Sequence, residues 1–347
     1  MNSENIKVSV IVPMYNVEDY IQETLESLIN QNLAQFEIIL IDDQSIDSTY
    51  DIASHFANQY NFIVLHQLEK NCGVSVARNK AIEMARGEFI FFLDSDDTIP
   101  LNTLELMYDT AIQKNADLVT GIYERFDSKS QTMMNFFYQF PELQQEGYKS
   151  IYDCPSLLYS VYACGKLIKK SIINDIRFSE KLKYGEDQVF TIACYLRSNK
   201  IYHLATNVYN YRIREIISNS ASQSVYKDPL MNFNYLIEML RNVQDEFKLR
   251  INDTDLRSNM YSIYFKRVLY WNIWTAISNT LLSLNVINRK IVIEKYIFLI
   301  NNLDEQIFKN NKNDFEVINL KIEKLKSVLD TKTIESIKTL SQTLKNK

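Results

Sequence analysis

Glycine and proline are scarce in this sequence, whose 347 residues include only six glycines and five prolines. Together with abundant asparagine, isoleucine and lysine, this scarcity is typical of bacterial chains encoded by DNA of low GC content. The sequence also has no internal repeat and no low-complexity linker. Because its length exceeds the usual single-domain size of about 100–200 residues, we expect one full domain and a second unit.

Cysteine is sparse as well, and basic charge does not dominate. The four cysteines lie far apart and lack the close spacing of zinc or redox motifs, so we expect reduced thiols. They are Cys72, Cys154, Cys164 and Cys194. With 38 basic and 43 acidic residues the formal net charge is −5, which argues against nucleic acid as a partner.

Long apolar runs are missing too. No stretch reaches the ~18 apolar residues that a membrane-spanning helix needs. The polar residues 1–5 do not resemble a signal peptide. We therefore expect a soluble, cytoplasmic protein, with peripheral association at the inner face of the membrane as the alternative.

Apolar residues in the first third of the chain alternate between the spacing of strands and that of helices. Strands are expected at residues 8–12, 36–41, 62–65 and 89–93, with helices between them. The helix before the last of these strands is expected to end at Gly87, a residue type common in left-handed caps. This order predicts an α/β fold with a mostly parallel central sheet covered by helices on both faces.

The character of the sequence changes after about residue 225. Residues 230–247 and 258–284 are rich in aliphatic and aromatic residues and contain neither glycine nor proline, which predicts helices. We therefore expect two domains, an α/β domain at residues 1–225 and a helical subdomain at 226–347. The aromatic residues of the second are expected to form a core, and an acceptor or membrane-surface platform is the alternative.

Polar or acidic turns follow three of the expected strands. They are Pro13-Met14-Tyr15-Asn16, Asp42-Asp43 and Asp94-Ser95-Asp96. Ligands of such sheets bind beyond the carboxyl ends of the strands, and two carboxylates one residue apart suit a hard divalent cation that also holds a diphosphate. The first strand lacks a following glycine-rich turn, which disfavours a nicotinamide-dependent dehydrogenase.

The chain resembles the family 2 glycosyltransferases of the GT-A fold over roughly residues 6–225. Four stretches in the family's order carry the resemblance, and they are residues 8–16, 39–45, 71–79 and 87–97. Further on, Tyr184-Gly185-Glu186-Asp187 resembles the family's Glu-Asp element, and Tyr209-Asn210-Tyr211-Arg212 begins a segment like its closing one. The expected fold is therefore a GT-A domain followed by helices.

The resemblance implies a pocket for a uridine nucleotide. Its expected residues are Pro13, Tyr15, Asp42, Asp43, Asn71 and Arg78. Of these, Pro13 and Tyr15 would line the base, and Asp43, with Asp42 beside it, would accept the uracil N3–H group.

The same resemblance assigns the Asp94-Ser95-Asp96 turn to the diphosphate. Asp94 would contact the ribose or a metal-bound water, and Asp96 would coordinate Mg²⁺ or Mn²⁺, with Ser95 between them at the nucleotide. Asp97 either supports the metal site from behind or caps the following helix.

A catalytic base and a phosphate clamp are expected further along the chain. Asp187 is the expected base of an inverting displacement, with Glu186 as the neighbouring alternative. Both residues also suit the first turn of a helix, whatever their chemical role. Arg212 and Arg214 either clamp the diphosphate together with Ser218 and Ser220 or lie on an ordinary solvated loop.

The function implied is transfer of a hexose or N-acetylhexosamine from a UDP-sugar to a hydroxyl group. The expected acceptors are a cell-surface glycan, a lipid-linked polysaccharide precursor or a glycoprotein, as in polysaccharide biosynthesis or protein glycosylation. The expected cofactor is Mn²⁺ or Mg²⁺, and homo-oligomerisation stays open. The alternative is a non-catalytic nucleotide-sugar-binding subunit of a glycan assembly complex.

Overall fold

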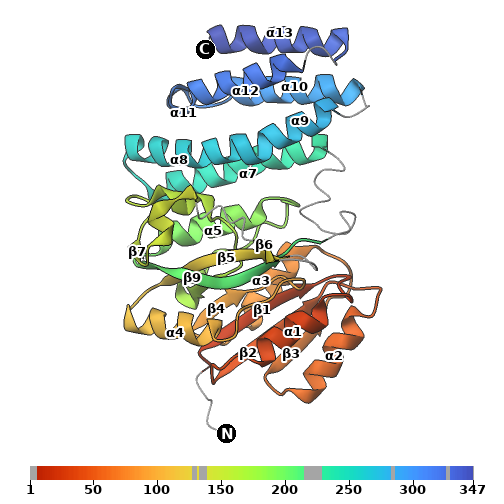
Figure 1. Ribbon diagram of the computed structural model, residues 1–347, viewed down its shortest axis with the longest axis vertical. Coiled ribbons are helices and arrows are strands. Elements are labelled where there is room, and N and C mark those ends of the chain that lie inside the picture. Colours follow the sequence, from red (N-terminus) through yellow and green to blue (C-terminus); the bar gives the residue numbers. More distant parts are fainter. Residues whose placement is uncertain are drawn as a thin grey trace. The chain divides into compact units, whose positions relative to one another are not determined.

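The chain forms two compact units, residues 1–215 and 216–347, which we call the N-terminal and C-terminal units (Figure 1). The computed structural model describes residues 6–126, 131–132, 139–214, 229–282, 286–325 and 329–346. The domain boundary predicted after residue 225 lies outside the described residues and stays a prediction.

The N-terminal unit alternates strands and helices, as predicted. Its strands are β1 (Val8–Met14), β2 (Phe36–Asp42), β3 (Ile63–Gln67), β4 (Phe89–Phe92), β5 (Leu118–Phe126), β6 (Gln131–Thr132), β7 (Gly147–Lys149), β8 (Lys166–Lys169) and β9 (Ile201–Arg212). Its α-helices are α1 (Ile21–Ile29), α2 (Thr49–Gln59), α3 (Val74–Met84), α4 (Thr103–Gln113) and α5 (Glu186–Arg197). Three short 3₁₀ helices are η2 (Pro141–Gln144), η3 (Pro155–Tyr159) and η4 (Lys170–Ile173).

These strands form one nine-stranded sheet in the order β3-β2-β1-β4-β8-β5-β9-β7, with β6 paired to β5. Strands β1 to β4 are mutually parallel, and β5 is parallel to β9. Strand β8 is antiparallel to both β4 and β5, and β7 is antiparallel to β9. The sheet is therefore mixed. Its parallel half carries the three predicted ligand-binding turns at one edge.

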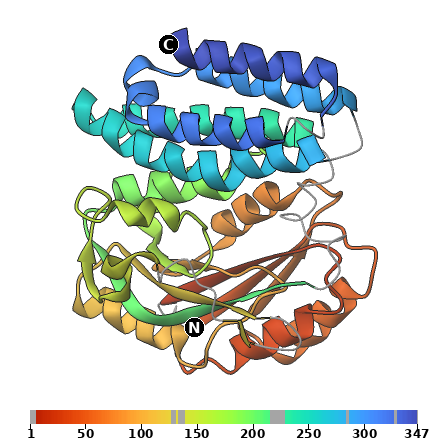
Figure 2. The same cartoon turned by 45° about the horizontal axis from the view of Figure 1, so that its top comes forward.

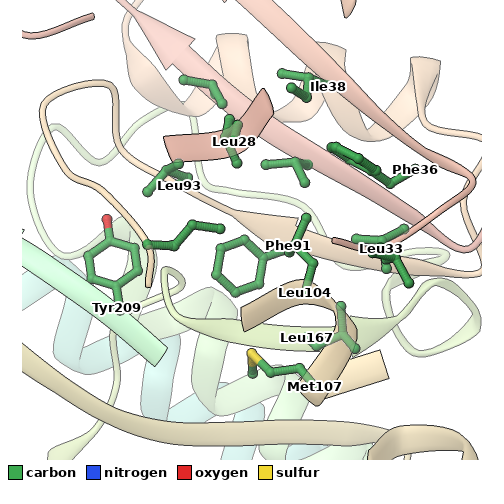
Figure 3. Packing of buried hydrophobic residues seen from close by; sticks show 14 of the residues in the cluster. Leu28, Leu33, Phe36, Ile38, Phe91, Leu93, Leu104, Met107, Leu167 and Tyr209 are labelled. Carbon is green, nitrogen blue, oxygen red and sulfur yellow. The ribbon is translucent and has the colours of Figure 1, made fainter. Parts of the chain in front are cut away.

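Both faces of the sheet are covered by helices (Figure 2). On one face, apolar side chains of β1, β2 and β4 pack with α1 and α4, and Leu28, Leu104 and Phe91 lie in this cluster (Figure 3). On the other face, α3 packs against β1 and β2, and Phe190 of α5 stacks on Phe178 near Phe92. Burial on both faces explains why these strands are almost continuously apolar.

Gly87 serves a different purpose from the predicted helix cap. Helix α3 ends at Met84, and Gly87 does not have a positive φ. A Cβ atom at Gly87 would lie 2.5 Å from the backbone nitrogen of Ser9, and the Ser9 hydroxyl accepts a hydrogen bond from the Gly87 N–H group. Glycine is therefore required here because β1 and the entry to β4 approach too closely for any side chain.

The C-terminal unit is helical, as predicted. Its helices are α7 (Pro229–Arg250), α8 (Thr254–Val268), a π-helical turn η5 (Leu269–Ile273), α9 (Trp274–Leu282), α10 (Val286–Asn301), α11 (Glu305–Asn310), α12 (Lys312–Lys324) and α13 (Thr331–Asn346). Tyr264 and Phe265 are buried in its core, whereas Tyr270 and Trp274 lie against the ammonium of Lys321. Among the described residues, no helix combines the length and apolarity needed to cross a bilayer.

Candidate active site

Three predicted turns meet at the carboxyl edge of the parallel strands. Because β2 and β4 both run parallel to β1, the residues that follow them lie at the same edge as Tyr15. Pro13 is buried within β1, opposite Ile41, and the Tyr15 side chain beyond it is 46% exposed. The topology thus brings together residues from three separated motifs, as the sequence predicts.

Asp42 and Asp43 are buried and shape the turns around them. The Asp42 carboxylate accepts hydrogen bonds from Gln67 and from the backbone N–H and hydroxyl of Ser45. The Asp43 carboxylate accepts the backbone N–H groups of residues 72 and 73 at 2.7 and 2.8 Å. Asn71 donates to the Asp43 carbonyl. The Asp43 carboxylate therefore holds the loop before α3 in place, and the Asp42 carboxylate ties the turn after β2 to the end of β3. A role at a nucleotide base stays a prediction for both.

Arg78 joins the Asp94-Ser95-Asp96 turn to the helix that carries the predicted base. Its guanidinium donates to Asp94 at 2.8 Å and to Glu186 at 3.1 Å, and it lies over the Phe178 ring at 5.0 Å. Burial by itself opposes the charged form, but the Asp94 and Glu186 carboxylates outweigh it and raise the pKa of Arg78 above its ordinary value. Arg78 is thus a fixed cation between two carboxylates from distant motifs.

The Asp96 side chain forms an ion pair with Arg214, whose Nε atom lies 2.7 Å away. Arg212, the last residue of β9, donates from its Nε to the Asp96 carbonyl and from its terminal nitrogen to Glu23. Both arginine side chains also lie against the Tyr20 ring of the segment before α1. Arg212 and Arg214 are therefore folded against the acidic turn, whereas Ser218 and Ser220 lie outside the described residues.

Asp97 and Tyr209 form a buried hydrogen-bonded pair next to the acidic turn, and the sequence did not reveal this pairing. The Tyr209 hydroxyl donates to one Asp97 oxygen and accepts the backbone N–H of Asp94, while Arg212 N–H donates to the other Asp97 oxygen. Tyr209 lies at one end of the buried cluster, with its hydroxyl on the side of Leu93 (Figure 3).

Of the two interpretations of Asp97, helix capping is wrong, because Asn102 precedes the first residue of α4. Burial, with nearby carboxylates, raises the pKa of Asp97 well above its usual range. The sequence motif Tyr209-Asn210-Tyr211-Arg212 signalled this segment, but not its contact with the acidic turn.

Glu186 and Asp187 open helix α5 after Gly185, which has a φ of 80°. The Glu186 side chain is 12% exposed and is held by Arg78. Asp187 is partly exposed, and one of its oxygens accepts the backbone N–H of Gln188. The helix N-terminus favours both negative charges, so the predicted helical role and a chemical role are compatible.

The acidic turn has the donor set for a cation shared with a diphosphate. In the described part of the chain, no cluster of three histidine, cysteine or acidic side chains could hold a metal ion by itself. Burial raises the pKa of Asp96, its pairing with Arg214 opposes this, and the nearby Asp94 carboxylate adds to the rise. Asp94 and Asp96 thus fit Mg²⁺ or Mn²⁺ when phosphate and water supply the other ligands.

Comparison with known proteins shows the family. The model of "Glycosyl transferase family 2" matches residues 9–174. "Glycosyltransferase GlyG" of Streptococcus pneumoniae is 30% identical over 254 residues, which cover 71% of this chain and 80% of that protein. The chain belongs to glycosyl transferase family 2. The predicted family and enzyme class, glycosyltransferase, are confirmed.

Two other relatives of this glycosyltransferase are much longer than this chain. "Poly(ribitol-phosphate) beta-glucosyltransferase" of Bacillus spizizenii is 33% identical over 214 residues, which cover 60% of this chain and 32% of that protein. The chain thus spans about a third of the length of two of the curated relatives it matches.

A crystal structure of Staphylococcus aureus TarS 1-349 in complex with UDP-GlcNAc shares the fold of this glycosyltransferase. Its TM-score is 0.77 at 24% identity, and the match covers 98% of this chain and 92% of that one. The predicted GT-A fold with a helical C-terminal part is confirmed.

Proposed function

We propose that this glycosyltransferase moves a hexose or N-acetylhexosamine from a UDP-sugar to a hydroxyl of a cell-surface glycan or its precursor, with inversion at the anomeric carbon. The observation that carries the proposal is the chain of contacts from Asp94 through Arg78 to Glu186, which links the acidic turn to the start of α5. A donor held at the turn would thereby face the carboxylates of α5.

Asp187 is the better candidate for the base within that pair. The Glu186 carboxylate is already held in an ion pair by Arg78, and its side chain is only 12% exposed. Asp187 is partly exposed at the same helix end, where an acceptor hydroxyl can reach it. Asp187 would take the proton of that hydroxyl as the new glycosidic bond forms.

Asp96 and Asp94 would hold the cofactor, Mn²⁺ or Mg²⁺. When bound, a divalent cation offsets negative charge on the UDP leaving group. The Asp96 carboxylate is paired with Arg214, so the donor and the metal together would have to displace the Arg214 side chain. The displaced Arg214 would then turn to the diphosphate, for which guanidinium groups are suited, with Arg212 beside it.

The acceptor class is inferred from relatives. Names such as "Poly(ribitol-phosphate) beta-glucosyltransferase" favour an anionic, hydroxyl-rich polymer of the bacterial surface, and hence a role in polysaccharide biosynthesis. The UDP-GlcNAc complex of TarS supports a uridine-nucleotide donor. Further proposals of the same kind are a cytoplasmic location with peripheral membrane contact, oligomerisation and protein glycosylation.

The proposed function is tested by UDP release from a panel of UDP-sugars, with and without Mn²⁺ or Mg²⁺, in the presence of lipid-linked, poly(ribitol-phosphate) and glycoprotein acceptors. We expect one donor to be turned over in a metal-dependent and acceptor-dependent manner. UDP binding without turnover of any donor would instead favour the non-catalytic subunit.

Asp96→Ala should abolish the metal dependence of UDP binding. We expect the affinity gained on adding Mn²⁺ to fall by at least about 10-fold, because one cation ligand is lost. Isothermal titration calorimetry with UDP, with Mn²⁺ present or replaced by a chelator, measures this gain. Arg214 loses its ion pair with Asp96 in this variant and can still attract phosphate, so metal dependence is the decisive quantity.

Asp109→Ala, which removes an exposed carboxylate of α4, is the matched control and should keep the full gain. An undiminished gain in Asp96→Ala would show that Asp96 is not a metal ligand.

A further inference from the structure

The guanidinium of Arg214 is paired with Asp96, the residue that the proposed function assigns to the metal. The Nε atom of Arg214 lies 2.7 Å from an Asp96 carboxylate oxygen, and the two side chains are only 10% and 19% exposed. Salt screens an ion pair enclosed to this extent less than a surface pair. A cation that uses this Asp96 oxygen must therefore displace Arg214.

Arg214 is also held by an aromatic ring. The centre of its guanidinium lies 4.9 Å from the centre of the Tyr20 ring, and the guanidinium of Arg212 lies 5.4 Å from the centre of the same ring. The face of a tyrosine ring attracts a cation at such distances. Tyr20 thus adds to the hold on Arg214 without adding a charge.

The start of helix α1 ties Tyr20 to the acidic turn. Tyr20 immediately precedes α1, and Thr24 lies one turn further along the helix. Thr24 is fully buried, and its hydroxyl lies 3.0 Å from the Ser95 carbonyl oxygen and 2.8 Å from the Asp97 carbonyl oxygen. The Tyr20 ring is therefore fixed relative to the turn that carries Asp96.

The end of strand β9 fixes the other side of Arg214. The terminal nitrogen of Arg212 donates to Glu23 at 2.6 Å, and its guanidinium lies 4.4 Å from the centre of the Phe126 ring. The backbone N–H of Ile213 donates to the Phe126 carbonyl at 2.8 Å. Arg214 follows directly on this anchored backbone, and its side chain reaches back to Asp96.

The chemistry of the Arg214–Asp96 pair distinguishes a free metal ion from a metal ion that arrives with a nucleotide. A guanidinium that leaves an enclosed carboxylate loses its counter-charge, which is costly. A free divalent cation offers Arg214 no replacement and brings more positive charge. A diphosphate offers Arg214 another anion of suitable geometry. Exchange of partners is therefore favourable only when the diphosphate and the metal bind together.

We propose that Arg214 and Tyr20 form a latch on the metal site. Arg214 keeps Asp96 paired until a nucleoside diphosphate offers another anion, and Tyr20 is the positioning residue that holds Arg214 in place. The inference rests on the proposed function, in which Asp96 binds the metal. Its consequence is weak binding of free metal, because the binding-competent arrangement of Asp96 is seldom populated before the nucleotide arrives.

The test is the affinity of the full chain for Mn²⁺ without nucleotide, measured from the electron paramagnetic resonance signal of free Mn²⁺. We expect Arg214→Met to bind Mn²⁺ at least about 10-fold more tightly than the unaltered protein, because the competing cation is lost. Tyr20→Leu keeps every charge and should bind Mn²⁺ about 3-fold more tightly, because only the ring is lost. Tyr20→Phe keeps the ring and is the matched control, with the affinity of the unaltered protein.

The Mn²⁺ measurements also decide against the latch. Unchanged Mn²⁺ affinity in Arg214→Met would overturn it. Tighter binding in Arg214→Met but not in a folded Tyr20→Leu, or equal effects of Tyr20→Leu and Tyr20→Phe, would refute the role of the Tyr20 ring.

A second measurement does not depend on folding of a Tyr20 variant, whose side chain packs against the buried cluster. In protein with ¹⁵N-labelled arginine, the Nε–H signal of Arg214 is assigned by its loss in Arg214→Met. Mg²⁺ alone should leave this signal in place, and UDP with Mg²⁺ should shift it. An equal shift with Mg²⁺ alone would contradict the latch.

Failure of the proposed function gives a different pattern. If no UDP-sugar is turned over but Mn²⁺ affinity changes as expected, the latch stands and the chain binds nucleotide without transferring sugar. If sugar is transferred while Arg214→Met binds Mn²⁺ like the unaltered protein, the transferase function stands and the latch is refuted.

Discussion

Asp187→Asn is expected to lower kcat by at least about 100-fold and to leave UDP affinity unchanged, because the amide keeps the shape of the side chain but cannot accept the acceptor proton. Steady-state kinetics with the donor found by the UDP-release screen measures kcat, and calorimetry measures UDP binding. This combination separates a base from a nucleotide ligand, since loss of a ligand would weaken binding as well.

Two further variants make the result specific to Asp187. Asp51→Asn removes an exposed carboxylate from the first turn of α2 and controls for the loss of one charge at a helix N-terminus. Its kcat should match that of the unaltered protein. Glu186→Gln tests the alternative base, and a deeper loss of kcat there than in Asp187→Asn would transfer the assignment to Glu186.

Arg78→Met is expected to destabilise the N-terminal unit by about 3–5 kcal/mol at neutral pH. The variant leaves Asp94 and the enclosed Glu186 without their shared cation, and an uncompensated charge in a protein interior is costly. Urea unfolding followed by circular dichroism measures the change in the free energy of unfolding. Because the chain forms two units, the transition of residues 1–215 should be followed separately, through a probe in that unit.

Acidification should reduce this loss. A carboxylate left without its cation loses its uncompensated charge when it binds a proton, so the penalty is smaller at low pH. The deficit should therefore be smaller near about pH 4.5 than near pH 7.

The double variant Arg78→Met/Glu186→Gln removes one orphaned charge and should recover part of the lost stability at neutral pH. An equal deficit at both pH values, with no recovery in the double variant, would indicate that lost packing on Phe178 is the main cause.

Much of the fold follows from local signals along the chain. The apolar runs that became β1, β2 and β4 are short and β-branched or aromatic, and each is followed by a polar turn. Such runs indicate strands without knowledge of their neighbours, and parallel order follows because a helix connects each to the next. The prediction of Gly87 as a cap failed because its purpose depends on Ser9, which lies 78 residues earlier in the chain.

In the candidate site too, local motifs reveal some residues, whereas contacts between distant residues stay hidden in the sequence. Asp94, Asp96 and Asp187 stand out because their motifs are local, and a few adjacent residues suffice to suggest their chemistry. Arg78 also lies in a local motif, but its ion pair with Glu186 joins residues 108 positions apart, and the Tyr209–Asp97 hydrogen bond joins residues 112 apart. Neither pairing has a spacing that a sequence pattern could reveal.

The sequence by itself determined the alternation of strands and helices, the helical C-terminal part, the family and the acidic turn, because each depends on residue types within a short stretch. Only the tertiary structure decided which charges meet: Arg78 with Asp94 and Glu186, and Arg214 with Asp96. The physical reason is that electrostatic interaction depends on distance in space and on burial, and both arise only when the sheet brings remote strands together.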